Sequence, residues 1–195
     1  MLRIFSTGLD AAIAALILLP LFLLFNRFWF HDLRKTVCCF FFCVFLCAMF
    51  AVAGLPDIRY MRFDPRFNFK PFAYMFSDYT NSLLNVLLFV PLGFSLPVLW
   101  RKYASAGKTL LFGFSVSLLI EVLQIFTYRA SDVNDLMTNT LGTLIGWAAG
   151  KLVLQLVPGL VPSPNARELS FVCTAAFCVM FFLQPFLADW VCNLL

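Results

Sequence analysis

Six apolar stretches alternate with shorter polar connections along the chain. Each stretch has about 20 residues and few charges, which is the length at which an α-helix crosses the roughly 30 Å hydrocarbon core of a bilayer. The stretches occupy residues 11–28, 36–56, 82–100, 109–127, 136–157 and 169–187. This pattern predicts an all-α fold, a polytopic transmembrane helix bundle of about six transmembrane helices in a single domain.

The composition supports this interpretation. Of 195 residues, 62% are hydrophobic and only 12% are charged, far from the average of soluble proteins. The net charge of +4 is spread over the connections, with no dense basic run that would bind nucleic acid. The seven cysteines fall in or beside the apolar stretches without a metal-binding spacing, and we interpret them as packing residues. We therefore expect membrane lipids as partners, no nucleic acid and no cofactor.

Lysine and arginine in the connections predict the orientation in the membrane. The first, third and fifth connections are short and dense in positive charge, which favours the cytoplasmic side. Both termini and the loops 57–81 and 128–135 are then outside. The loop 57–81 is rich in aromatic and basic residues, as segments at the headgroup level of a membrane are. A connector adapted to that depth, without a role of its own, is the alternative.

The fourth stretch contains an ionisable residue that hydrocarbon does not explain. Glu121 lies inside the predicted helix, and Gln124 follows on the same face. A charged residue in a membrane helix costs a few kcal/mol and usually faces the protein interior. The pair therefore either lines a functional site or joins helices by hydrogen bonds.

A polar turn connects the fourth and fifth stretches. Ser131 or Asp132 is a natural N-cap for the fifth helix, and Asp135 falls in its first turn, where the helix dipole favours a negative charge. Capping does not explain Asn139, which lies one turn deeper on the same face. Small residues then recur at every fourth position, which predicts the close approach of another helix. They are Gly142, Gly146 and Gly150.

The third helix carries a matching polar set at its outer end. Asp78, Asn81 and Asn85 are spaced i, i+3 and i+7. Short connections predict that the third, fourth and fifth helices are antiparallel neighbours, so their polar sets converge. Arg129 and Lys70 are candidates for the counter-charge.

Three of these patterns resemble the VanZ-like family of bacterial membrane proteins. FKPF at 69–72 is a degraded form of a family N-L-x-P-F loop, with Phe69 where the family usually has leucine. D-x-x-N-x-x-x-N followed by LLFVPLGF spans 78–94, and E-x-x-Q-x-x-x-x-R-x-x-D-x-x-D-x-x-x-N-x-x-G spans 121–142. The apolar stretches predict two amino-terminal transmembrane helices in 1–56 and a carboxy-terminal transmembrane helix in 158–195. The resemblance, which covers roughly 68–156, implies a VanZ-like core in 57–157 between them. It also implies a multi-pass protein of the bacterial cytoplasmic membrane.

The founding member of this family is linked to low-level resistance to teicoplanin, a lipoglycopeptide antibiotic. The residues and the resemblance together favour a non-enzymatic envelope protein with a polar pocket in the outer leaflet. The pocket would bind a lipid-linked envelope precursor, a lipidated antibiotic or another amphiphile, and influence susceptibility to glycopeptide and lipopeptide antibiotics. The candidate ligand-binding residues are Asp78, Asn81, Asn85, Glu121, Gln124, Arg129, Asp132, Asp135 and Asn139.

Two other classes of function stay open. An intramembrane enzyme that modifies a lipid headgroup would use Asp132 and Asp135 as candidate Mg²⁺ ligands and Glu121 as a general base. A structural accessory subunit of an envelope-polymer machine would use the same polar residues to join helices. No catalytic residue is assigned from the sequence.

Overall fold

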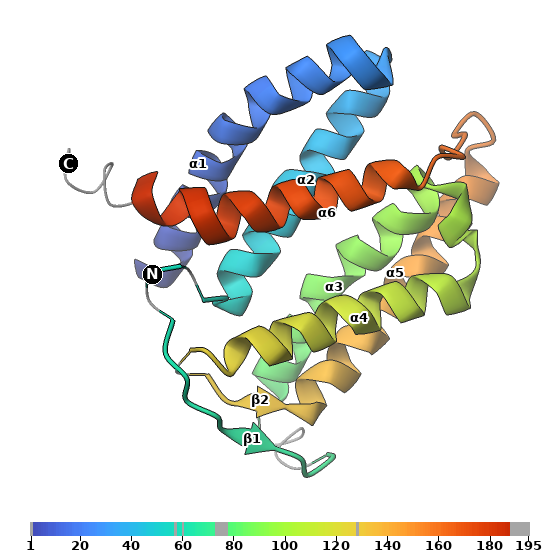
Figure 1. Cartoon of the computed structure of the whole chain (residues 1–195). Coiled ribbons are helices and arrows are strands. Elements are labelled where there is room, and N and C mark those ends of the chain that lie inside the picture. The colour runs from blue at the N-terminus through green and yellow to red at the C-terminus, as the bar shows by residue number, and fades with distance from the viewer. Residues whose placement is uncertain (1, 57, 60, 73–77, 128, 188–195) are drawn as a thin grey trace. The chain divides into compact units, whose positions relative to one another are not determined.

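A computed structural model describes the chain except residues 1, 57, 60, 73–77, 128 and 188–195. It also leaves the side chains of residues 2–7 undescribed. The described part is almost entirely helical (Figure 1), which confirms the all-α prediction. Its α-helices are α1 (Leu2–Phe25), α2 (Leu33–Ala53), α3 (Tyr79–Leu99), α4 (Ala106–Gln124), α5 (Val133–Leu156) and α6 (Arg167–Cys178). Two-residue strands, β1 (Phe67–Asn68) and β2 (Ser131–Asp132), form the small parallel sheet.

Short segments of other helix types adjoin these elements. A π-helical segment, Asn26–Phe30, continues α1, and a second one, Val179–Leu183, continues α6. A 3-10 helix, Arg101–Ala104, connects α3 to α4.

Within the described residues, five helical segments are long and apolar enough to cross a membrane. They are Gly8–Phe30, Leu33–Ala53, Tyr79–Leu99, Ala106–Gln124 and Arg167–Leu187. The prediction of a polytopic transmembrane helix bundle is therefore confirmed. The remaining predicted stretch forms α5, whose glycine, threonine and asparagine residues dilute its apolar character. Several of these small and polar residues contact neighbouring helices: Gly142 and Gly146 lie against α3, and Asn139 against α4.

The observed helix ends follow from capping groups. The second helix begins three residues before the predicted stretch, because the Asp32 side chain accepts hydrogen bonds from the backbone N–H groups of Arg34 and Lys35, at 3.0 and 3.3 Å. The same helix ends at Gly54, whose φ of 67° is a left-handed conformation that favours glycine.

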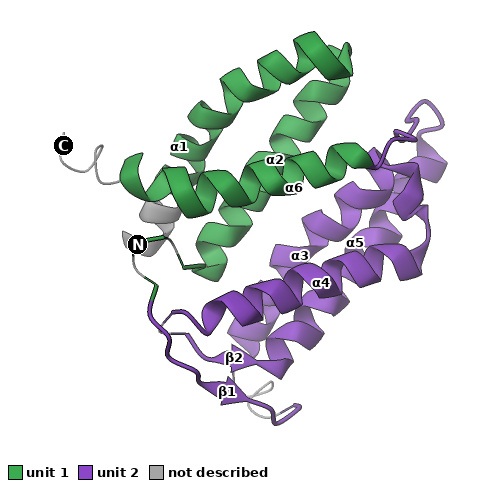
Figure 2. Ribbon diagram, viewed as in Figure 1, with its two compact units in different colours: residues 1–61, 167–195 green, residues 62–166 purple. Residues whose placement is uncertain are grey.

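The chain divides into two compact units, coloured separately in Figure 2. Unit 1 contains residues 1–61 and 167–195, and unit 2 contains residues 62–166. The first two helices therefore belong with the last one, although about a hundred residues separate them in the sequence. Each unit is described by itself below.

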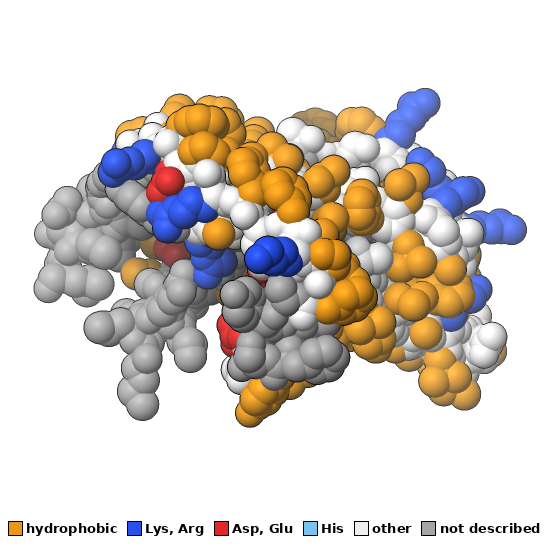
Figure 3. All heavy atoms as spheres, turned by 90° about the horizontal axis from the view of Figure 1, so that it is seen from below, with side chains coloured by type: hydrophobic (Ala, Val, Ile, Leu, Met, Phe, Trp, Pro, Cys, Tyr) orange, Lys and Arg blue, Asp and Glu red, His pale blue; other side chains and the backbone are white. Residues whose placement is uncertain are grey.

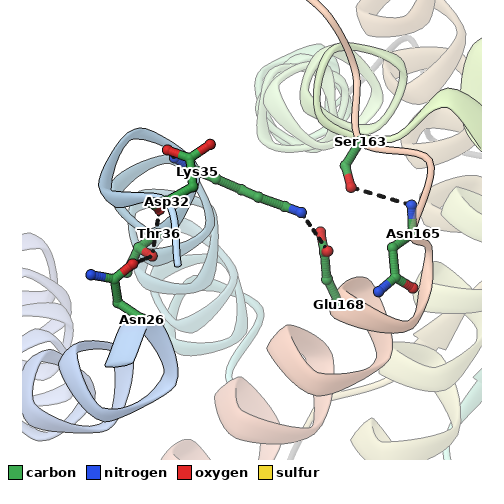
Figure 4. Close-up of polar contacts among 7 residues, drawn as sticks. All are labelled: Asn26, Asp32, Lys35, Thr36, Ser163, Asn165 and Glu168. Carbon is green, nitrogen blue, oxygen red and sulfur yellow. Dashed lines mark hydrogen bonds and ion pairs between the residues drawn. The ribbon is translucent and has the colours of Figure 1, made fainter. Parts of the chain in front are cut away.

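Unit 1 packs α2 against α1 and α6. The cysteines at 39, 43 and 47 form a buried stripe on α2, and the thiol of Cys43 lies 3.5 Å from the carbonyl oxygen of Val172 on α6. At one end of the unit, Nζ of Lys35 lies 2.5 Å from Oε1 of Glu168 (Figure 4). The pair joins α2 to α6; the Glu168 side chain is 3% exposed and that of Lys35 is 29% exposed, so the carboxylate is buried while the lysine is partly exposed.

Unit 2 is built on the contact between α3 and α5, the most extensive helix pair in the described chain. The glycines of α5 allow this contact: a Cβ atom on Gly142 or Gly146 would lie only 2.2 or 2.1 Å from a backbone carbonyl oxygen of α3. The close approach predicted from the glycine spacing is thereby confirmed. Helix α4 packs on α5, with Gly113 against the side chain of Thr143.

Candidate functional site

The loop that begins unit 2, at residue 62, lies along the connection between α4 and α5. Its strand β1 pairs in parallel with β2, so that Phe67 lies opposite Ser131 and Asn68 opposite Asp132. The backbone N–H of Ser131 donates to the carbonyl oxygen of Arg66 at 2.9 Å. Two segments that are more than 60 residues apart in the sequence thus meet at the start of α5.

Asn134 joins these two segments. The sequence pattern did not identify it as a candidate residue. Its side chain is buried, and its Oδ1 accepts a hydrogen bond from the backbone N–H of Phe72 at 2.6 Å. Its Nδ2 donates to the carbonyl oxygen of Lys70 at 3.3 Å and to Oδ1 of Asp132 at 2.9 Å. We call this set of bonds the amide clasp. The only signal in the sequence is an amide beside the predicted cap of the fifth helix, in a polar turn.

Asp132 uses its carboxylate to cap α5 and to hold the loop. Oδ1 accepts from the backbone N–H of Asn134 at 2.8 Å, which confirms the predicted N-cap. Oδ2 accepts from Nδ2 of Asn68, also at 2.8 Å. Both carboxylate oxygens are thus engaged within the fold, and Asn68 is a second residue that the candidate set did not include.

Glu121 is buried and joins α4 to the same turn. Its Oε2 accepts a hydrogen bond from the backbone N–H of Asp132 at 2.8 Å, and its own carbonyl oxygen accepts from the hydroxyl of Ser131 at 2.6 Å. Gln124, one turn further along, is also buried, and its carbonyl oxygen accepts from the hydroxyl of Thr127 at 2.9 Å. The glutamate therefore faces the protein interior and holds backbone, as a buried carboxylate must to offset its desolvation.

Asn139 lies deeper in the interface between α4 and α5. Its Nδ2 donates to the hydroxyl of Ser117 at 2.9 Å, and both side chains are buried. This bond joins the two helices in the way expected of amides in membrane proteins. Ser117 was not among the residues expected from the sequence.

A second group of polar side chains gathers around Asp135 in the first turn of α5, as predicted for that residue. Asn85 of α3 lies against the Asp135 carboxyl group, and the charges of Asp132, Arg129 and Asp78 act on it. We call Asp78, Asn85, Arg129 and Asp135 the α3/α5 cluster. Asp135 is half-buried, whereas Asp78 is exposed at the start of α3.

Asp78 also caps α3, because its Oδ1 accepts from the backbone N–H of Asn81 at 3.4 Å. The side chain of Asn81 is exposed on the first turn of that helix. The structure therefore brings most of the candidate residues to one end of unit 2, while Asn139 lies further inside and Asn81 at the rim. Their role in binding a ligand stays a prediction.

The chemistry of the carboxylates bears on the candidate Mg²⁺ ligands. Among the described residues, no group of three or more histidine, cysteine, aspartate or glutamate side chains is arranged to hold a metal ion. Asp132 has hydrogen-bond donors on both carboxylate oxygens, which leaves Asp135 as the less committed carboxylate.

The helices and the buried polar residues define a multi-pass helical membrane protein. Residues 40–154 match the family model described as VanZ/LLP1, which is more than half of the chain, and the protein belongs to that family. The family resemblance seen in the motifs is thereby confirmed, and the match begins earlier than they do, inside α2. No curated protein and no solved structure matches the chain.

Proposed function

We propose that this VanZ/LLP1 protein binds the polar headgroup of a lipid-linked or amphiphilic ligand at the α3/α5 cluster. The proposed site faces the outer leaflet of the bacterial cytoplasmic membrane. By holding such a ligand, a lipid-linked envelope precursor or a lipidated antibiotic, the protein influences susceptibility to glycopeptide and lipopeptide antibiotics.

The observation that carries this proposal is the position of Asp135. Asp132 and Glu121 hold backbone and neighbouring side chains, so the fold accounts for them. Asp135 instead meets Asn85 of another helix, with the charge of Arg129 in reach. The cluster thus combines a carboxylate, an amide and a guanidinium at a helix end.

This combination suits a headgroup with both donors and acceptors. A carboxylate accepts hydrogen bonds, a guanidinium donates them and an amide does both, so hydroxyl and amide groups of sugars or peptides find partners. The cluster lies where α3 and α5 begin, at one end of the apolar span Tyr79–Leu99, and we place this end at the level of the headgroups. An amphiphile can present its headgroup there while its apolar part stays in the bilayer.

The test is complementation of a gene deletion in the native host. The Asp135→Asn and Asn85→Ala variants, produced at the wild-type level, are expected to leave teicoplanin and lipopeptide susceptibility as in the deletion strain. Lys108→Gln, an exposed change at the opposite end of α4, is the control and should restore the wild-type phenotype. A deletion without effect on susceptibility, or full complementation by both cluster variants, would overturn the proposal.

A structural accessory role is the second candidate, favoured by the internal bonds of Glu121 and Asn139. If polar residues only join helices, every variant with a phenotype will also lose folded protein. Detergent-extracted protein levels, measured beside susceptibility in the same strains, separate the two functions.

A further inference from the structure

Residues 62–72, RFDPRFNFKPF, alternate apolar and basic side chains at the end of unit 2 that carries β1 and β2. We call them the interfacial loop. Three cations stand against one carboxylate, so the formal charge of the loop is +2. Figure 3 looks onto this end of the molecule and shows Lys and Arg side chains beside apolar ones, with acidic side chains only in small patches. The function proposed above makes no use of these side chains.

The phenylalanine side chains of the loop are largely exposed, although the ring of Phe63 also contacts that of Phe126, with centroids 5.9 Å apart. Phe63, Phe67, Phe69 and Phe72 have 49% to 76% of their surface exposed. The rings of Phe67 and Phe69 stack with their centroids 5.4 Å apart, so they present one continuous apolar edge. In water, exposed rings do not gain the free energy of apolar burial. At the headgroup level of a bilayer, aromatic rings are favoured.

The backbone of the loop is held by hydrogen bonds, so the positions from which the rings project are fixed. The backbone N–H groups of Arg62 and Asp64 donate to the carbonyl oxygens of Phe126 and Ile125, each at 3.0 Å. The amide clasp of Asn134 holds the other end of the loop. A preformed surface loses less conformational freedom on binding than a mobile one does.

One cation of the loop, Arg66, pairs with the single carboxylate. Nη2 and Nε of Arg66 lie 2.5 and 3.2 Å from Oδ2 of Asp64, and this guanidinium holds the pKa of the Asp64 carboxyl below its ordinary value. A guanidinium has five N–H donors, so Arg66 keeps donors for an oxyanion besides this pair. Lys70 is exposed beside the aromatic edge.

We propose that the interfacial loop is a preformed binding surface for anionic phospholipid. Its phenylalanine rings enter the boundary between headgroups and acyl chains, and Arg66 and Lys70, together with Arg62, bind the lipid phosphate. An anionic lipid matches both features of the loop, because its phosphate suits the net positive charge and its apolar part suits the rings. A soluble anion would contact only the cations.

The test places a reporter in the loop itself. Phe69→Trp protein is reconstituted into nanodiscs of phosphatidylcholine that contain a small fraction of brominated lipid, and the emission of the parent protein is subtracted. We expect stronger quenching by brominated phosphatidylglycerol than by brominated phosphatidylcholine. Because a basic residue near an anionic surface contributes about a fivefold preference, Arg66→Gln with Lys70→Gln should abolish most of the difference.

Two further variants control for structure and for general charge. Arg66→Lys with Lys70→Arg keeps both charges and should keep the preference. Arg101→Gln with Lys102→Gln removes two exposed cations outside the loop, between α3 and α4, and should leave the quenching of the reporter unchanged.

Several results would overturn the proposal. Equal quenching by the two lipids, or a preference that survives the double glutamine change, would show that the loop does not select anionic lipid. Loss of the preference in the charge-conserving variant would assign the effect to structure. If soluble glycerol phosphate, at the concentration of the lipid, competes with the lipid, the loop is a simple anion site. If neither brominated lipid quenches the reporter, a second copy of the chain covers the loop. The Asp135→Asn change should not alter the preference, so this test is independent of the proposed ligand.

Discussion

Oδ1 of Asn134 accepts a hydrogen bond from the backbone N–H of Phe72 at 2.6 Å, across 62 residues of sequence. Phe72 has a φ of 61°, a left-handed conformation that is uncommon for a residue with a side chain. The same amide also holds the carbonyl oxygen of Lys70. One buried side chain at the start of α5 therefore fixes the end of the interfacial loop in a conformation that the loop alone would not favour.

We expect Asn134→Ala to release this end of the loop. The change removes the acceptor of the Phe72 N–H, and because water can reach this exposed residue, we expect a cost of about 0.5–1.5 kcal/mol of unfolding free energy. Trypsin should then cleave after Arg66 more rapidly in detergent-solubilised protein. Asn81→Ala, at an exposed position on α3, is the control and should leave the cleavage rate unchanged. Equal rates in Asn134→Ala and wild type would show that the clasp does not hold the loop.

Changes at Glu121 separate its hydrogen bond from its charge. Glutamine keeps an acceptor for the backbone N–H of Asp132, so Glu121→Gln should cost less than about 1 kcal/mol. Glu121→Ala removes the acceptor and should cost about 1–3 kcal/mol. Unfolding in detergent, followed by circular dichroism, measures both. If glutamine costs as much as alanine, the negative charge, with Arg129 in reach, stabilises the protein instead.

The contact between α3 and α5 should not tolerate an added methyl group. A Cβ atom on Gly146 would lie 2.1 Å from the carbonyl oxygen of Val90 and 2.7 Å from the nitrogen of Phe94, so the helices must separate. We expect Gly146→Ala to lower the unfolding free energy by about 1–3 kcal/mol or more. Gly107, in the first turn of α4, has no such neighbour within 4 Å. Gly107→Ala should be neutral or stabilise by up to about 1 kcal/mol; similar losses at both glycines would contradict the packing argument.

The sequence predicts the helices well because the length of an apolar stretch is fixed by the bilayer, whatever the helix contacts. It predicts their ends less well because these depend on single groups. The fourth helix was expected over 109–127, but it ends at Gln124, where the carbonyl oxygen accepts from the backbone and side chain of Thr127. The predicted N-cap of α5 was correct, since a cap acts within a few residues of its own position.

The candidate site shows the same division between local and distant contacts. Helical spacing places Glu121 and Gln124 on one buried face, and both are buried. Spacing cannot show that Glu121 bonds the backbone of Asp132, or that Asn134 reaches Phe72, because those contacts depend on how the loop pairs with the turn. Residues that hold backbone from a distance carry no periodic signal, and Asn134 was missed for that reason.

In unit 1, the ion pair of Lys35 and Glu168 should show strong energetic coupling. Lys35→Met leaves the Glu168 carboxylate, which is 3% exposed, without its lysine. We expect the free energy of unfolding to fall by about 3 kcal/mol. This is the low end for buried pairs, because Lys35 is partly exposed. The double change to Lys35→Met and Glu168→Leu should recover most of this loss, since no buried charge remains. A double-mutant cycle by chemical unfolding in detergent measures the coupling, with the exposed Arg34→Met as the control. Additive losses in the double variant would show that the two side chains stabilise the unit independently.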